Sequence, residues 1–540
     1  MVGWYWVTSF IIVLAIMTYM FNRIRNIPFY PFFFALFPIL TLLGHNIKEV
    51  DARVAIRSIA LSLLATLVIF LLARLVLRDW VKAAIVTGLL LVLFFSYGHL
   101  YHLVRNIPTV GIRVARHRYF FPAYLTLALA GTGWVWLKVK HPHNITPALN
   151  LVTLLLLVFP TYQITSNVLR TSIASEKQAS IFSAAENLPI QQAGVMPDIY
   201  LIILDGHIRS DALRQDLGYD NSGFINELRD LGFYVADCSR SNYTGTSGSL
   251  ISELNMNYMD ALGQQMMEQG LKPEDISVLL SLSIVRYQLE AIGYKTYAFE
   301  SGYELSRFRD AHAYLSHTSS PYTLQMLQPF EVMLIKSTAL LIWADSTYKA
   351  MPEYVSTPFH GINFAFEDHV NRQLFILDQL PKLATIHEHK FVFAHIIVPH
   401  IPYVFAPDGS IVTDPGFYSG DRGEPVDRDY EVLGYINQVQ FIDDRIVQVA
   451  RQILENSDPP PIIIIQGDHG MEKENRLANL DALYMPGEGS RNLYPSITPV
   501  NHFRIIFNTY FGSSYDILPD LSYDKDGLLS VDPYPLCTDP

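Results

Sequence analysis

Residues 459–470, PPPIIIIQGDHG, restrict the possible folds of this chain more than any other segment. Four consecutive isoleucines are typical of a strand that is buried on both faces of a parallel sheet. Open α/β sheets place their chemistry at the carboxyl ends of such strands. Asp468 and His469 follow the apolar run directly and lie between glycines, so we expect them to be metal ligands at a strand end.

A second apolar run has the same design. Residues 197–206, PDIYLIILDG, end in Asp205 and a glycine, which puts another acid at the end of another buried strand. Because parallel strands bring their carboxyl ends to one edge of a sheet, we expect Asp205 to lie near Asp468 and His469. An isolated Asp-His pair is more often a structural hydrogen-bonding pair in a loop. The repeated position at strand ends favours a metal site.

The first third of the chain differs in composition from the rest. The whole sequence is 50% hydrophobic and 17% charged, but nearly all long apolar runs lie before residue 170. Since a membrane-spanning helix needs roughly 20 apolar residues, the sequence predicts about six spans. They are residues 4–21, 28–44, 54–77, 83–104, 119–137 and 147–169. The first span lacks the basic start and the cleavage site of a signal peptide, so we expect it to stay as an anchor.

Charge patterning bears on orientation and on partners. Lys and Arg occur on both sides of the predicted spans, so the positive-inside rule alone does not fix the orientation. Arg23 and Arg25 follow the first span, which no charge precedes, and this favours an outside amino terminus. With an even number of spans, we expect a multi-pass protein of the plasma membrane whose carboxyl-terminal domain is extracytoplasmic. The formal charge of -12, without a dense basic stripe in the soluble part, argues against a nucleic-acid partner.

The sequence predicts four successive regions: a transmembrane region (1–170), a partly helical connector (171–196), a soluble domain (197–519) and a carboxyl-terminal tail (520–540). In the soluble domain, strands are predicted at 199–204, 233–236, 295–299, 391–398, 462–465 and 503–507, and helices at 223–231, 276–292 and 429–454. We therefore expect an all-α transmembrane bundle followed by an α/β domain with a central, mostly parallel sheet. Cys238 and Cys537 form no disulfide framework by count, which leaves their pairing and their compartment open.

Between the two ligand strands lies the segment 241–260, SNYTGTSGSLISELNMNYMD. Small residues let the backbone approach an anion, and free amides at a helix start favour negative charge. A hydroxyl in this segment is a candidate nucleophile toward phosphate, and spacing alone does not separate Thr244, Thr246 and Ser247. An ordinary helix cap is the competing interpretation, because Ser and Thr are preferred at that position.

Two carboxylates, one hydroxyl and one imidazole make an oxygen-rich ligand set. Such a set suits one divalent ion better than a metal that selects thiolates. We expect this ion to be Mn or Zn, with Mg as a further candidate. The ion would lower the pKa of the hydroxyl and hold a phosphate oxygen.

Histidines of the segment FAHIIVPHIPY are further candidates. His400 lies between two prolines just after a strand, where it can donate to the transferred phosphate or protonate the leaving oxygen. Packing against Tyr403 without chemistry is an equally good interpretation. We expect His395 to belong to the core or to lie behind the ligands. His502 is expected near the site only if its strand neighbours the central ones.

These motifs give the soluble domain a resemblance to the alkaline phosphatase and sulfatase superfamily. It looks most like the membrane-anchored branch of lipoteichoic acid synthases, phosphoglycerol transferases and phosphoethanolamine transferases. The strand-end acid, the SNYTGTSGSLISELN segment, the PHIPY loop and the QGDHG turn occur in that branch's order. The resemblance implies that Asp205, Thr246, Asp468 and His469 bind one divalent ion. It also implies that Thr246 forms a covalent phospho-enzyme intermediate and that His400 contacts the substrate.

The sequence departs from the family pattern in several places. The first acidic ligand is Asp205, where the synthases and ethanolamine transferases usually have glutamate, and this puts the metal in question. Two cysteines fall short of the disulfide set that is common in phosphoethanolamine transferases, which counts against that substrate. Cys238 is followed by Ser-Arg-Ser-Asn and not by the x-Pro-x-Arg of a formylglycine sulfatase. One metal cluster is evident, where a two-zinc phosphatase needs more ligands.

We expect a membrane-anchored transferase that cleaves a lipid headgroup ester, phosphoglycerol or a similar phospho-alcohol, through a phosphothreonine. A covalent intermediate suits transfer to a glycan or polymer hydroxyl. The alternative is a metal-dependent phosphodiesterase, phosphatase or sulfuric-ester hydrolase, since the sequence does not separate water from an acceptor hydroxyl. An inactive membrane-bound binding module would show the loss of a ligand, and all four are present. A transporter would leave the large soluble domain unexplained.

Overall fold

The computed structural model describes residues 26–47, 50–105, 107, 114–140, 145–183, 190, 196–272, 275–303, 306–308, 310–317, 329–342, 364–412, 428–471, 476–534 and 537. The chain forms two compact units. The membrane unit comprises Met1–Leu169 and Leu327–Ala365, and the sheet unit comprises Arg170–Met326 and Phe366–Pro540. Residues 327–365 thus cluster with the membrane unit, although they fall inside the soluble domain expected from the sequence. The expected domain boundaries stay a prediction.

The described part of the membrane unit is helical. Its helices are α2 (Tyr30–Asn46), α3 (Ile56–Leu77), α4 (Trp80–Arg105), α6 (His117–Lys138), α7 (Thr146–Ser183) and α14 (Pro329–Ser337). Four stretches are long and apolar enough to cross a membrane: Ala52–Leu77, Trp80–Arg105, His117–Lys138 and Thr146–Lys177. α2 has 17 residues and is shorter than these. The predicted span 4–21 lies outside the described residues, so the number six stays a prediction.

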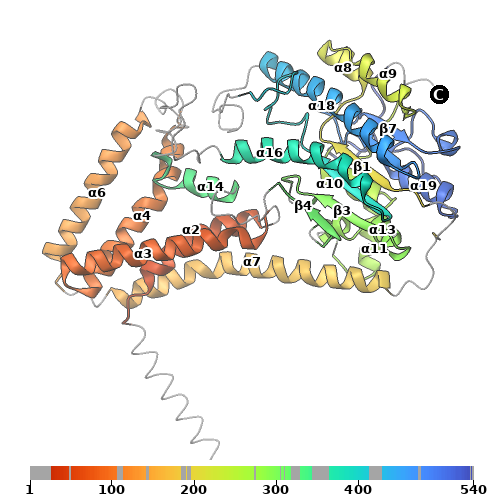
Figure 1. Cartoon of the computed structure of the whole chain (residues 1–540). Helices are drawn as coiled ribbons and strands as arrows, with labels where there is room; N and C mark the ends of the chain where they lie inside the picture. Colours follow the sequence, from red (N-terminus) through yellow and green to blue (C-terminus); the bar gives the residue numbers. More distant parts are fainter. Residues whose placement is uncertain are drawn as a thin grey trace, which may run out of the picture. The chain divides into compact units, whose positions relative to one another are not determined.

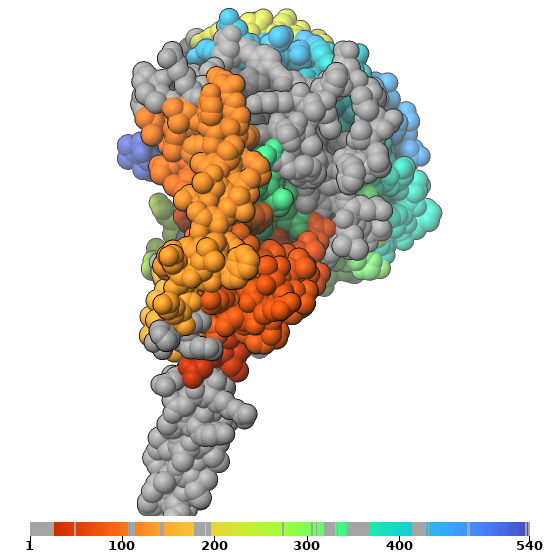
Figure 2. All heavy atoms as spheres, turned by 90° about the vertical axis from the view of Figure 1, so that its left-hand side faces the viewer, coloured from red at the N-terminus to blue at the C-terminus, as the bar shows by residue number. Residues whose placement is uncertain are grey.

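The helices of the membrane unit expose apolar side chains that a soluble helical bundle would bury. Leu72 and Leu75 of α3 and Leu129 of α6 are more than half exposed. A helix in water hides such side chains, whereas lipid solvates them. Figure 2 shows one face of the membrane unit, with the helices before residue 170 coloured red to orange. Within the unit, α4 is the most enclosed span, with half of its apolar window buried.

Helices α7 and α14 differ from what the sequence predicts. α7 continues beyond the last predicted span to Ser183, so the beginning of the expected connector is helical. α14 lies between strands and helices of the sheet unit in sequence, yet Phe330 of α14 packs with Ile39 and Leu43 of α2. The sequence of the sheet unit is therefore interrupted by an insertion that belongs to the membrane unit.

The sheet unit is built on one seven-stranded sheet with the strand order β2-β7-β6-β1-β5-β3-β4. The strands are β1 (Ile199–Leu204), β2 (Tyr234–Val235), β3 (Lys295–Phe299), β4 (Ala313–Leu315), β5 (Lys390–Ile396), β6 (Ile462–Gln466) and β7 (Asp481–Tyr484). β6, β1, β5, β3 and β4 are parallel, and β7 is antiparallel to β6 and to β2. The expected transmembrane bundle and mostly parallel α/β domain are both confirmed.

Helices cover both faces of the sheet (Figure 1). On one face lie α10 (Thr246–Leu254), α11 (Met259–Glu268), α12 (Val278–Ser281), α13 (Ile284–Ala291) and α19 (His502–Tyr510). On the other lie α9 (Ser222–Asp230), α16 (Phe364–Gln379) and α18 (Arg428–Asn456), and α8 (Ser210–Leu217) packs beside them. Alternate residues of β1 contribute to the two cores, and all six are buried. This double coverage explains why the central strands are continuous apolar runs.

Three details of the predicted secondary structure are corrected. The predicted strand 503–507 is wrong, because these residues lie in helix α19. Periodicity does not distinguish a short apolar run in a strand from one in a buried helix. The predicted helix 276–292 is two helices, α12 and α13, since Ser283 caps the second with a hydrogen bond to the Arg286 amide. Strands β4 and β7 were not predicted.

The carboxyl-terminal tail is bound to the sheet unit. Cys238 and Cys537 form a disulfide across 299 residues of sequence. Asp532 accepts a hydrogen bond from Arg209 Nη1 at 2.9 Å, and the Tyr534 ring is buried. Sequence had left this cysteine pairing open, because sequence separation says nothing about distance in space.

Candidate metal centre and active site

The strand ends bring three predicted ligands together. Asp205 follows β1 directly, and Asp468 and His469 follow β6 after a single glycine. β1 and β6 are adjacent and parallel, so both ends open at the same edge of the sheet. Gly467 is required at this point, because a Cβ there would lie 2.1 Å from the His207 carbonyl oxygen.

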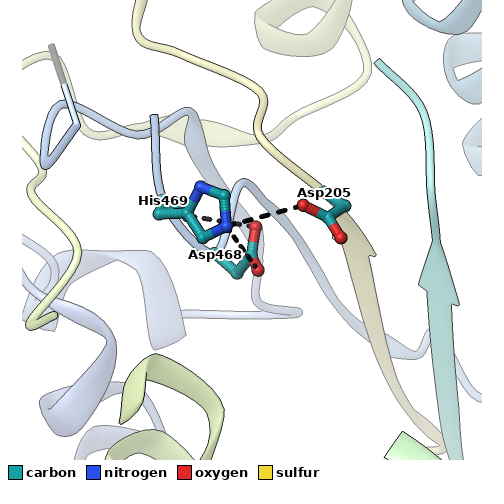
Figure 3. A group of neighbouring side chains, drawn as sticks. All are labelled: Asp205, Asp468 and His469. Atoms are coloured by element: carbon teal, nitrogen blue, oxygen red, sulfur yellow. Dashed lines mark hydrogen bonds and ion pairs between the residues drawn. The ribbon is translucent and has the colours of Figure 1, made fainter. Parts of the chain in front are cut away.

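Side-chain atoms of Asp205, Asp468 and His469 lie within 4.8 Å of one another, and all three residues are buried. His469 Nε2 is 3.6 Å from Asp205 Oδ1 and 3.6 Å from Asp468 Oδ2 (Figure 3). His469 Nδ1 donates to the Gly470 carbonyl at 2.8 Å, which leaves Nε2 as the nitrogen with a lone pair toward the carboxylates.

The two carboxylates fit a cation at this position. Asp468 Oδ1 accepts the backbone N–H groups of Gly206 and His469, each at 3.0 Å. Among the described residues, Asp205 Oδ1 and Asp468 Oδ2 are buried and have no hydrogen-bond partner. Buried charged oxygens are costly unless a cation or a donor compensates them. The donor set of two carboxylate oxygens and one imidazole nitrogen suits Mn, Zn or Mg.

Thr246 lies at the same point and is not a helix cap. It is the first residue of α10, and Gly245 occupies the N-cap position. Its Oγ1 is 3.3 Å from His469 Nε2. Because Gly245 has no side chain to cap α10, the first-turn amides stay available to an anion. Ser247 points elsewhere, with its Oγ 2.9 Å from the Tyr303 hydroxyl. The structure thus separates Thr246 from Ser247, which sequence spacing did not.

His400 and His395 approach the centre from the strand next to β1. The rings of His400 and His469 have their centroids 6.1 Å apart. His400 Nδ1 donates to the Ile401 carbonyl at 2.7 Å, which leaves Nε2 for other partners. His395 is fully buried on β5 with Nε2 3.2 Å from Asp205 Oδ2. His395 therefore lies behind a predicted ligand, one of its two expected places.

The charge balance favours ionised carboxylates. Burial acts to raise the pKa of Asp205, but the neighbouring imidazoles of His395, His400 and His469 outweigh it. The net result is a pKa below the ordinary value for aspartate. A carboxylate that stays ionised at neutral pH can bind a cation.

The sequence did not single out Arg476. Its Nε donates to the Thr244 carbonyl at 2.7 Å, and its Nη1 donates to the Gly470 carbonyl at 2.9 Å. Arg476 thus joins the loop before Thr246 to the loop after His469. Burial lowers its pKa, against the charges of Asp468 and Asp205. Its spacing in sequence carries no signal for this role, which depends on two loops meeting in space.

Comparison with known proteins gives structural matches alone. No protein-family model and no curated protein matches the chain. The C-terminal periplasmic domain of EcEptC from Escherichia coli is 13% identical, covers 64% of this chain and 95% of its own, and gives a TM-score of 0.40. Lipooligosaccharide phosphoethanolamine transferase A from Neisseria meningitidis is 13% identical, covers 90% of this chain and 95% of its own, and gives a TM-score of 0.35.

A putative sulfatase, yidJ, from Bacteroides fragilis is 12% identical, covers 61% of this chain and 75% of its own, and gives a TM-score of 0.32. By name, these proteins are of the kinds that the sequence resembles. None of these three is named as a lipoteichoic acid synthase. Identities of 12–13% and TM-scores of 0.40 or less do not carry an activity or a substrate to this chain.

Proposed function

We propose that this protein is a membrane-anchored, metal-dependent phospho-group transferase of the alkaline phosphatase and sulfatase superfamily. Its donor is a lipid headgroup ester, and its nucleophile is Thr246. The observation that carries this proposal is that the Thr246 hydroxyl, at the start of α10, lies beside His469 and two buried carboxylates. The facing oxygens of these carboxylates have no hydrogen-bond partner among the described residues. The resemblance to the membrane-anchored branch of this superfamily implies such a hydroxyl nucleophile beside one divalent ion.

The side chains of the site have distinct roles. Asp205, Asp468, His469 and Thr246 would hold one divalent ion, Mn or Zn and also Mg. When bound, the ion lowers the pKa of a hydroxyl and neutralises charge on the phosphate. The first-turn amides of α10 favour the negative charge of the phosphate group. His400 offers Nε2 toward the leaving oxygen.

The reaction proceeds in two displacements. Thr246 Oγ1 loses its proton to water and attacks the headgroup phosphorus, and the bond from phosphorus to the diacylglycerol oxygen breaks. His400, protonated at Nε2 in this step, gives that proton to the leaving oxygen and becomes neutral, and the diacylglycerol stays in the membrane. An acceptor hydroxyl of a glycan or polymer then attacks the phosphothreonine phosphorus and gives its proton to His400 Nε2, while the Thr246 oxygen leaves and takes up a proton from water.

The disulfide supports an extracytoplasmic site. Disulfides persist in oxidising compartments and are rare in the cytosol. Cys238 and Cys537 both belong to the sheet unit, so the compartment of this bond is the compartment of the predicted active site. We therefore propose a multi-pass plasma-membrane protein whose sheet unit faces the cell envelope.

Intact mass of the full chain in detergent tests the proposal. The protein is incubated with Mn²⁺ or Zn²⁺ and, separately, with phosphatidylglycerol, phosphatidylethanolamine and cardiolipin. We expect one lipid to add its phospho-headgroup to the wild type and not to Thr246→Ala, and the added mass to identify the headgroup. Ser247→Ala is the matched control, because its hydroxyl points to Tyr303, and it should be modified like the wild type.

The fate of the adduct separates transfer from hydrolysis. Decay in buffer alone identifies a hydrolase with water as the acceptor, whereas decay only after a glycan or polymer hydroxyl is added identifies a transferase. A wild type that binds no metal and forms no adduct with any lipid would leave the binding-module interpretation in place.

A further inference from the structure

A second buried polar cluster lies behind the candidate active site. His502, the first residue of α19, contacts a carboxylate with each ring nitrogen. Its Nδ1 is 3.1 Å from Glu253 Oε1, and its Nε2 is 2.9 Å from Asp481 Oδ2. All three side chains are completely buried. His502 begins a helix and not a strand, so the condition under which it was expected near the metal ligands does not apply.

The cluster connects the elements that carry Thr246 and Asp468. Glu253 lies in α10, seven residues after Thr246, and an α-helix returns to nearly the same face after seven residues. Its Oε2 accepts a hydrogen bond from Gln466 Nε2 at 2.6 Å. Gln466 ends β6, two residues before Asp468. One carboxylate thus joins the helix of the nucleophile to the strand of a ligand.

Asp481, the carboxylate at the other ring nitrogen of His502, also contacts neighbouring elements. Asp481 begins β7 and pairs with Gln466 in the β6–β7 register. Asp481 Oδ2 also accepts a hydrogen bond from Ser239 Oγ at 3.0 Å. A histidine that meets a carboxylate at each nitrogen can donate to both of them as an imidazolium. It offsets the charges of two acids that would otherwise repel each other in the core.

We propose that His502 is the positioning residue for Thr246. By fixing Glu253 between itself and Gln466, it holds the buried face of α10 against the end of β6, with the Thr246 hydroxyl beside His469. This inference rests on the proposed function, since it assigns the cluster a role through the nucleophile. Without His502, Glu253 keeps a single neutral donor, and α10 is free to shift along β6.

A double-mutant cycle in metal affinity tests this role without using activity. Affinity for Mn²⁺ is measured by calorimetry on the full chain in detergent for wild type, Thr246→Ala, His502→Gln and the double variant. We expect each single change to weaken binding by about tenfold, as for residues that support a metal site. If His502 acts through Thr246, the double variant should bind Mn²⁺ less than about twofold more weakly than His502→Gln alone. The reason is that the Thr246 hydroxyl is already displaced in His502→Gln.

Two further variants keep the test decisive. Lys390→Met breaks another buried ion pair, with Asp198, at the amino ends of β1 and β5, and should leave metal affinity unchanged despite a loss of stability. Glu253→Gln keeps the side-chain volume and removes the charge that His502 binds. It replaces His502→Gln in the cycle if that variant does not fold, with the same expected coupling to Thr246→Ala.

The outcomes separate this inference from the proposed function. If the wild type binds Mn²⁺ and the affinity losses of Thr246→Ala and His502→Gln are additive in the double variant, the proposed role of His502 is wrong. The proposed metal centre is not contradicted by that result. A wild type that binds neither Mn²⁺ nor Zn²⁺ contradicts the proposed function. It also contradicts the role of His502, which depends on that function. Loss of affinity in Lys390→Met equal to that in His502→Gln would show general destabilisation and would also overturn the inference.

Discussion

At the scale of single residues, three of the predicted ligands, Asp205, Asp468 and His469, each use one side-chain atom for a protein contact and present another atom to the centre. Asp468 Oδ1 is fixed by two backbone N–H groups, while its Oδ2 faces His469. His469 is held through Nδ1 and presents Nε2. Asp205 is held through Oδ2 by His395. Such support orients ligands before a cation arrives, so a change at the presented atom should affect binding more than folding.

Replacing Asp468 by Asn tests this division. The amide keeps the size of the side chain and the acceptor for the backbone N–H groups, but it removes the negative charge. We expect Mn²⁺ affinity to fall at least about tenfold with little change in melting temperature. Metal titration followed by mass spectrometry measures the bound ion. Asp520→Asn is the control, since that carboxylate accepts hydrogen bonds from Tyr494, Thr498 and Asn501, none of which is a predicted ligand. Metal content equal to the wild type would count against Asp468 as a ligand.

His400→Gln tests proton donation to the leaving oxygen. General acid catalysis contributes about 10²–10⁴-fold, and only when the leaving group needs a proton. We expect kcat on a phospholipid to fall about 10²-fold. Turnover of a bis-p-nitrophenyl phosphate, whose leaving group needs no proton, should change little. Equal losses on the two substrates would instead indicate phosphate binding by His400.

The predicted ligands and His395 could be found from the sequence, whereas Arg476 could not, for a physical reason. Asp205, Asp468 and His469 each end a strand, and strand ends are readable as apolar runs that stop at a glycine. Arg476 acts through backbone carbonyls of two loops, and no residue pattern marks which carbonyls meet it. The predicted ligands and the nucleophile candidate came together in space, and their metal-binding role stays a prediction.

At the scale of elements, α10 and α19 are coupled by charge. Burial opposes a charged imidazole, but the carboxylates of Asp481 and Glu253 outweigh it and raise the pKa of His502 to about 10. The folded state therefore keeps a proton that the unfolded chain releases near the ordinary pKa of 6.5. This stabilisation is complete below about pH 6.5 and is lost as the pH rises toward 10.

The melting temperature should record this loss. We expect the wild type to lose thermal stability steadily between pH 7 and pH 9.5, measured by calorimetry in detergent. His502→Gln should start lower and show a flatter dependence in this range, since it lacks the titrating group. Parallel curves for the two proteins would mean that His502 is not charged in the folded state.

The same elements show where sequence prediction of the fold stops. The long apolar strands β1, β5 and β6 were predicted because both of their faces are buried. The helix α19 was predicted as a strand, since its apolar residues 503 and 505–507 fit either structure over so short a run. β7 has four residues and begins with Asp481, so it lacks the apolar signature of the central strands.

At the scale of the whole chain, the disulfide and the tail close the sheet unit. The bond between Cys238 and Cys537 spans 299 residues, and disulfides of long loops typically stabilise by about 2–4 kcal/mol. We expect Cys238→Ser/Cys537→Ser, or reduction of the wild type, to lower the melting temperature and to expose the tail to protease. Mass mapping of the first cleavage products measures the exposure. Identical digestion of oxidised and reduced protein would contradict a stabilising role.

An ion pair between Arg57 and Glu331 connects the insertion α14 to the rest of the membrane unit. Arg57 Nε donates to Glu331 Oε1 at 2.6 Å, which joins the start of α3 to α14 among apolar neighbours. Charged groups beside a bilayer are costly unless they are paired. We expect Arg57→Glu to destabilise the chain in detergent, because two acids then meet in a site with little water. The reversed pair Arg57→Glu/Glu331→Arg should recover much of the loss, whereas Arg53→Glu, at a largely exposed neighbour, should cost little. A reversed pair as unstable as the single variant would show that geometry, and not charge pairing, holds α14 in the membrane unit.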